Sequence, residues 1–168
     1  MGCIFSKLSI GSAQFGMKYG ISNKTGIPKY DEISDLLDLA YANNINQIDT
    51  ARSYGRSEKI IGSYLSSKNK YSFSITTKIG SNDLSFLDQF NRSMKNLNNI
   101  PVNLLAHSYK TYIEKDFQDA VNHGKKNGLI KNFGLSLYRK SEVEDILKQS
   151  YLPQIIQLPL NILDKSLY

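Results

Sequence analysis

The chain has 168 residues, the length of one ordinary domain, and 40% of them are hydrophobic, which is enough for a buried core. Its single cysteine excludes an intrachain disulfide, and no cysteine and histidine cluster has zinc-ligand spacing, so we expect no metal site. The net charge of +6 comes from scattered lysines without interleaved aromatic side chains, which disfavours nucleic acid as a partner.

The N-terminus begins Met1-Gly2-Cys3 and continues to Ser6, a pattern that fits N-myristoylation beside a palmitoylated cysteine. A first strand starting near Lys7 would leave almost no tether between a lipid and the folded body, so we interpret the pattern as a chance occurrence. No apolar run reaches the roughly 18 residues of a membrane span, and no secretory signal precedes the domain. We therefore expect a cytoplasmic protein without a membrane partner.

Short β-rich runs alternate with longer segments of helical period, which predicts repeated βα units around a parallel sheet. Strands are predicted at residues 7–12, 46–50, 72–78, 102–107, 130–137 and 154–160. Helices are predicted at residues 31–43, 57–65, 83–97, 115–124 and 141–149, with Ser57 as the N-cap of the second. All connections are short, so residues 1–168 should form a single domain.

The segment after the first strand decides between an open sheet and a barrel. Residues 11–16 read GSAQFG, which lacks the G-x-G-x-x-G spacing of a nucleotide-binding turn and has no helix immediately after it. A (β/α)8 barrel instead gathers its chemistry at the carboxyl ends of its strands, where the notable polar residues fall here. The pattern predicts part of a TIM barrel, with six strands and five helices, and with strands 7 and 8 missing.

Four residues of complementary acid–base type lie at consecutive strand ends. Asp49 ends the second strand, Tyr54 follows in the next loop, Lys78 ends the third strand and His107 ends the fourth. Each alone would be an ordinary surface or capping residue. Together they are hard to explain as packing, because buried Asp and Lys cost free energy unless they pair. We predict that they form one catalytic site.

Such a set can reduce a carbonyl group, in which a hydride reaches the carbon and a proton reaches the oxygen. Tyr54 is the predicted proton donor, and Lys78 is expected to lower the phenol's pKa from its ordinary value of about 10. Asp49 would hold Lys78 charged and oriented. His107 would hydrogen-bond the substrate oxygen as a neutral imidazole.

Several segments resemble the aldo/keto reductase family. Residues 48–58, with the sequence IDTARSYGRSE, and Gly62 are similar to the signature of that family. The flanking resemblances are SAQFG at 12–16, YGI at 19–21 with Asn23, TTK at 76–78, LLAHS at 104–108, FGLS at 133–136 and IQLPLN at 156–161. The likeness covers nearly the whole chain and implies the four catalytic roles given above.

The resemblance also implies a cofactor and a class of substrate. NADPH is the family's usual hydride donor, and Ser136 and Gln157 would hydrogen-bond its nicotinamide carboxamide. Leu137 stands where many members have an asparagine, so one carboxamide contact departs from the family pattern. The implied substrate is a small carbonyl compound, without further identity.

Barrels of this kind run to about 250 residues, and the predicted strands number only six. In the family the last two units supply an aromatic shelf for the nicotinamide and a basic loop for the adenosine phosphate. We therefore expect little or no activity from this chain alone, and exposed first and sixth strands that invite pairing with another chain. A truncated gene, complementation by a second polypeptide and a non-catalytic binding or regulatory module stay open as alternatives.

Overall fold

The fold was described from a computed structural model, which covers residues 7–68, 72–81, 84–161 and 163. The described residues contain a six-stranded sheet in which each strand pairs in parallel with the next one along the chain. The strands are β1 Ile10–Gly11, β2 Gln47–Asp49, β3 Ser74–Ile79, β4 Val102–Ala106, β5 Ile130–Ser136 and β6 Ile155–Gln157. The predicted strands and their parallel order are confirmed. The N-terminal lipidation pattern lies outside the described residues.

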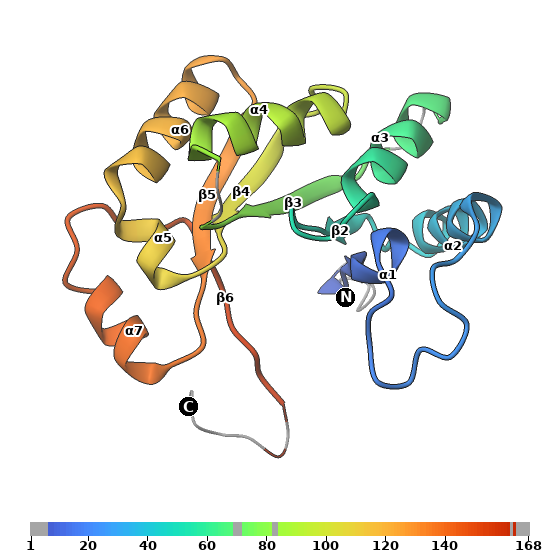
Figure 1. Ribbon diagram of the computed structural model, residues 1–168, viewed down its shortest axis with the longest axis horizontal. Coiled ribbons are helices and arrows are strands. Elements are labelled where there is room, and N and C mark those ends of the chain that lie inside the picture. Colours follow the sequence, from blue (N-terminus) through green and yellow to red (C-terminus); the bar gives the residue numbers. More distant parts are fainter. Residues whose placement is uncertain (1–6, 69–71, 82–83, 162, 164–168) are drawn as a thin grey trace.

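Helices follow the strands and lie along the outer side of the curled sheet (Figure 1). They are α1 Ala13–Gly16, α2 Tyr30–Ala42, α3 Ser57–Ser67, α4 Phe86–Asn96, α5 Tyr109–Ile113, α6 Lys115–Lys126 and α7 Lys140–Ile146. The five predicted helices are all present. The additional helices α1 and α5 have only 4 and 5 residues, too few to show a helical period in the sequence. No helix in the described part of the chain is long and apolar enough to cross a membrane.

Successive side chains along each strand point to opposite faces of the sheet, so core residues and site residues lie on different faces. In β3 and β4, Ile75 and Leu104 have no exposed surface and belong to the core between sheet and helices. Residues an odd number of positions away, such as Lys78 and His107, point to the inner face instead. The curled sheet therefore brings these polar side chains together on the inside of a half-barrel.

The sheet has two edges, formed by β1 and β6, at the open side of the half-barrel (Figure 1). Apolar side chains near the β6 edge stay accessible, since Ile156 is 41% exposed and Leu160 is 53% exposed. A sheet edge beside exposed apolar side chains favours pairing with a further strand. Pairing through these edges stays a prediction.

Candidate active site

The predicted site residues line one cavity of about 210 Å³ at the carboxyl ends of the strands. Strand ends and the loop after β2 supply the acid–base groups, and β5 and β6 supply the two polar residues assigned to the cofactor. The lining residues are Asp49, Tyr54, Lys78, His107, Ser136, Tyr138, Gln157, Leu158 and Pro159. Parallel strands explain this convergence, because their carboxyl ends share one rim.

A buried chain of hydroxyl groups anchors the loop that carries Tyr54. The Ser57 hydroxyl donates to the Ser12 hydroxyl at 2.8 Å, and Ser12 donates to the backbone carbonyl of Asp49 at 2.8 Å. Thr50 Oγ1 lies 3.1 Å from Ser57 Oγ. The prediction that Ser57 caps α3 is wrong, because Arg56 is the N-cap and the Ser57 side chain bonds across to the first strand instead. The network fixes both ends of the loop.

Gly16 packs directly against the Tyr54 loop. A methyl group at Gly16 would overlap backbone atoms of Tyr54 and Ser57, which cannot move without shifting the loop. We expect Gly16→Ala to lower the free energy of unfolding by about 2 kcal/mol or more, measured by denaturant unfolding. Gly11→Ala is the matched control, because a methyl group there meets no atom within 4 Å. Equal stability of the two variants would show that the loop is not packed in this way.

Lys78 is held by an ion pair and a backbone carbonyl. Its Nζ lies 2.7 Å from each carboxylate oxygen of Asp49 and 3.0 Å from the carbonyl oxygen of Thr50. The Lys78 side chain is 3% exposed and that of Asp49 is 21% exposed. Gln157 Nε2 donates to Asp49 Oδ1 at 3.1 Å. Burial lowers the pKa of Lys78, while the Asp49 carboxylate opposes that shift and favours the charged amine.

The prediction that Lys78 lowers the pKa of Tyr54 is wrong in this structure. Burial, with the nearby Asp49 carboxylate, raises the pKa of Tyr54 to about 12. Burial is the larger cause of this shift, and the Lys78 amine that was expected to favour phenolate is itself paired with both carboxylate oxygens of Asp49. Lys78 Nζ lies 5.3 Å from the centre of the Tyr54 ring. Tyr54 is therefore protonated at neutral pH.

His107 lies beside Tyr54, with the two ring centres 6.4 Å apart in an edge-to-face arrangement. Its backbone N–H donates to the carbonyl oxygen of Ile79 at 2.8 Å, which extends the pairing of β3 and β4 to this residue. Burial lowers the pKa of His107, and the Lys78 charge lowers it further. The imidazole is therefore neutral at pH 7, as the sequence analysis expected for a group that bonds a carbonyl oxygen.

The lowered pKa of His107 predicts how stability depends on pH. The unfolded chain binds this proton more readily than the folded one, so its contribution to stability is complete above the ordinary pKa of about 6.5 and is lost as the pH falls below it. We expect NMR titration of the ring to report the lowered pKa. We also expect the drop in unfolding free energy between about pH 7 and about pH 5 to be smaller in His107→Gln than in the original chain. An identical drop in both proteins would contradict this prediction.

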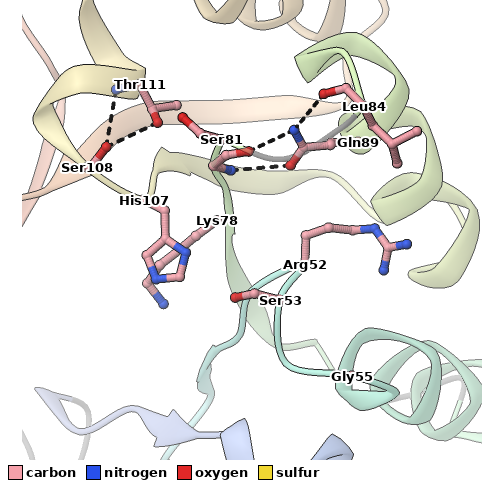
Figure 2. Close-up of a pocket in the computed structure, with 11 residues that line it drawn as sticks. Arg52, Ser53, Gly55, Lys78, Ser81, Leu84, Gln89, His107, Ser108 and Thr111 are labelled. Carbon is pink, nitrogen blue, oxygen red and sulfur yellow. Dashed lines mark hydrogen bonds between the residues drawn. The ribbon is translucent and has the colours of Figure 1, made fainter.

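Lys78 and His107 also border a second, larger cavity of about 550 Å³, on the β3 and β4 side of the site (Figure 2). Its other lining residues are mostly small or polar, namely Arg52, Ser53, Gly55, Gly80, Ser81, Leu84, Gln89, Ser108 and Thr111. Gln89 closes one side by bonding the backbone of Gly80 and of Leu84. This cavity was not predicted from the sequence. Position was the available signal, because Ser108 directly follows one assigned strand end and Gly80 lies two residues after another.

The whole chain was compared with known proteins. The sequence profile of the Aldo/keto reductase family matches residues 7–167. The chain belongs to the aldo/keto reductase family. Because the match spans nearly all of the sequence, the oxidoreductase assignment does not depend on the 48–58 segment alone.

Two curated relatives of this aldo/keto reductase chain come from fungi. D-arabinose 1-dehydrogenase of Saccharomyces cerevisiae is 30% identical over 149 residues, which cover 79% of this chain and 43% of the relative. The oxidoreductase sirO of Leptosphaeria maculans is 28% identical over 173 residues, which cover 93% of this chain and 51% of the relative. The chain thus spans about half the length of the curated relatives it matches.

A solved protein of Pseudomonas aeruginosa, described as an aldo-keto reductase, has a similar structure. The likeness has a TM-score of 0.79 and 26% sequence identity, and it covers 96% of this chain and 68% of the other. A solved aldo/keto reductase from Brucella melitensis shows the same fold with a TM-score of 0.68, over 90% of this chain and 57% of the other. The half-barrel is therefore a recognisable part of the reductase barrel.

The polar lining of the smaller cavity is chemically compatible with the nicotinamide end of a cofactor. Ser136 is 4% exposed and lines the cavity from β5, and Gln157 lines it from β6. A hydroxyl group and a side-chain amide together offer the donors and acceptors that a carboxamide requires. Lys78 is the one cation among the described lining residues, and it is already paired with Asp49. The fit does not extend to the cofactor's phosphates.

Proposed function

We propose that this site reduces an aldehyde or ketone to an alcohol with NADPH, and that Tyr54 is the proton donor. The main support is that Asp49, Tyr54, Lys78 and His107 line one cavity, together with Ser136 and Gln157. Family membership supports the oxidoreductase class. NADPH as the donor, and the catalytic roles of the individual residues, are our assignment.

Tyr54 carries the proton that the reaction consumes. With a pKa of about 12, the hydroxyl is protonated at neutral pH, so a proton is present for donation to the carbonyl oxygen. NADPH, when bound, supplies the hydride to the carbonyl carbon. The hydride and the proton together convert the carbonyl to an alcohol. Neutral His107 can donate a second hydrogen bond to the same oxygen and orient the carbonyl group.

Lys78 acts when the proton leaves Tyr54. The phenolate that forms carries a negative charge, which the nearby ammonium group stabilises. The Asp49 carboxylate, at 2.7 Å from Nζ, keeps that amine charged and oriented despite its burial. Bulk water then returns the proton to Tyr54. Asp49 is therefore a positioning residue, and Lys78 an electrostatic one.

The two cavities suggest where each reactant binds. Lys78 and His107 border both of them. Ser136 and Gln157 border the smaller cavity, which we assign to the nicotinamide. Arg52, Ser53 and Gly55 border only the larger cavity, which we assign to the substrate. A carbonyl group beside His107 would then meet the hydride donor and the proton donor together.

The test is NADPH consumption by the purified chain with a small aldehyde, followed by absorbance and by detection of the alcohol. No cation other than Lys78 lies among the described residues of the cofactor cavity, so we expect weak NADPH binding and a low rate. A high NADPH concentration compensates for the weak binding, and a long incubation compensates for the low rate. Absence of any alcohol at every NADPH concentration would overturn the proposal for this chain.

A further inference from the structure

We propose that Arg52 makes the larger cavity selective for carbonyl compounds that carry a carboxylate group. This inference rests on the proposed function, since it names the class of substrate for the same site. It depends on three observations: the position and hydrogen bonding of Arg52, the partners of the acidic residue paired with it, and the chemistry of the other lining residues.

Arg52 enters the cavity from the loop between β2 and Tyr54. Its backbone N–H donates to the carbonyl oxygen of Lys78 at 2.9 Å, which fixes the start of the side chain next to the catalytic lysine. The side chain then runs along the cavity beneath Leu84 and Gln89 in the view of Figure 2. Its Nε is buried and has no hydrogen-bond partner among the described residues. A buried donor without a partner costs free energy, which an incoming acceptor would recover.

Among the described residues, Glu58 forms an ion pair with Arg52, and this pair does not use all the donors of the guanidinium. Its Oε2 lies 3.9 Å from Arg52 Nη1, at the outer limit of an ion pair. The buried Glu58 carboxylate already accepts from Thr77 Oγ1 at 2.7 Å and from Asn96 Nδ2 at 3.2 Å. Glu58 therefore holds the guanidinium near the cavity, while the hydrogen bonds that Glu58 accepts come from Thr77 and Asn96. Donors of the five-donor guanidinium are left for a ligand.

The remaining lining residues favour an anion over a cation or an apolar ligand. No Asp or Glu is among the described residues of this cavity, whereas Arg52 and Lys78 both are. The hydroxyl groups of Ser53 and Ser81 lie beside them, and Leu84 is the one large apolar residue of the lining. A planar guanidinium matches a carboxylate with two parallel hydrogen bonds. A substrate with its carbonyl at His107 and its carboxylate at Arg52 uses both ends of the cavity.

The test measures how the 168-residue chain binds 4-oxopentanoate, a ketone that carries a carboxylate. The methyl ester of this acid is the matched probe, because it has no charge. We expect the acid, and not the ester, to shift the NMR signal of the Arg52 Nε–H group. We expect Arg52→Gln to weaken binding of the acid by about tenfold to a hundredfold, and to leave the ester unaffected. Arg56→Gln is the matched control, because Arg56 borders a different pocket of the surface.

Each outcome separates this inference from the proposed function. In Tyr54→Phe, which lacks the proton donor but keeps Arg52, the acid should still shift the Arg52 signal although reduction is lost. Equal binding of acid and ester, or an unmoved Arg52 signal in the original chain, overturns the inference even if aldehydes are reduced. A shift produced by inorganic phosphate but not by the acid would also overturn it. If Arg52→Gln fails to fold, the Arg52 signal of the original chain still decides.

Discussion

Tyr54→Phe should lower the rate of carbonyl reduction by about a hundredfold or more, the usual contribution of a positioned acid. The change removes one oxygen atom and leaves the ring, so the edge contact with His107 is kept. Without the hydroxyl, the carbonyl oxygen must take its proton from water at the moment of hydride transfer. The measurement is alcohol formed per unit time at saturating NADPH, and NADPH binding itself should change little.

The control for this variant is Tyr30→Phe. Tyr30 is an exposed tyrosine at the start of α2, bordering a separate surface pocket, so the loss of its hydroxyl should leave the rate unchanged. A rate for Tyr54→Phe within a few-fold of the original would mean that another group supplies the proton. His107 would then be the next candidate, because it borders the same cavity.

Lys78→Met should reduce both stability and activity. It removes one partner of a buried ion pair and leaves the Asp49 carboxylate beside apolar atoms. Because Asp49 retains 21% exposure, we expect a loss in unfolding free energy near the lower end for buried pairs, about 2 to 3 kcal/mol. The rate should fall as well, because Tyr54 loses the ammonium group that lies 5.3 Å from its ring centre. Denaturant unfolding and alcohol formation measure the two effects separately.

A second lysine–aspartate pair provides the comparison. Lys68 Nζ lies 2.8 Å from Asp38 Oδ2, but both side chains are about one-third exposed, at 34% and 31%. Lys68→Met should cost at most about 1 kcal/mol and leave the rate unchanged. In a double-mutant cycle, Lys78→Met and Asp49→Asn should be strongly non-additive, because each removes the same interaction. Additive losses would mean that the pair does not act as a unit.

The fold could be predicted from the sequence because its signals are local. Strand residues such as Ile75 and Leu104 alternate with polar ones, and the longer helices show their period directly. The strand-end positions of Asp49, Lys78 and His107 then follow from parallel topology, since carboxyl ends share a rim. Convergence of the predicted site residues on one cavity is thus a consequence of sequence pattern.

Features that depend on exact distance could not be predicted. The sequence predicted that Asp49 pairs with Lys78 near Tyr54, but not that burial of the Tyr54 hydroxyl would outweigh the lysine and raise the Tyr54 pKa. Ser57 looked like a helix cap, and only the fold shows that its hydroxyl bonds to Ser12. Arg52 has no distinctive spacing, and its importance comes from a buried Nε without a described partner. These are properties of packing between distant segments.

The central claim is that this site passes a hydride and a proton to one carbonyl group. The most direct measurement uses NADPH deuterated at the transferable position, an aldehyde, and mass spectrometry of the alcohol. We predict one deuterium on the carbinol carbon with the original chain, and far less product with Tyr54→Phe. Product without deuterium, or equal product from both proteins, would contradict the account.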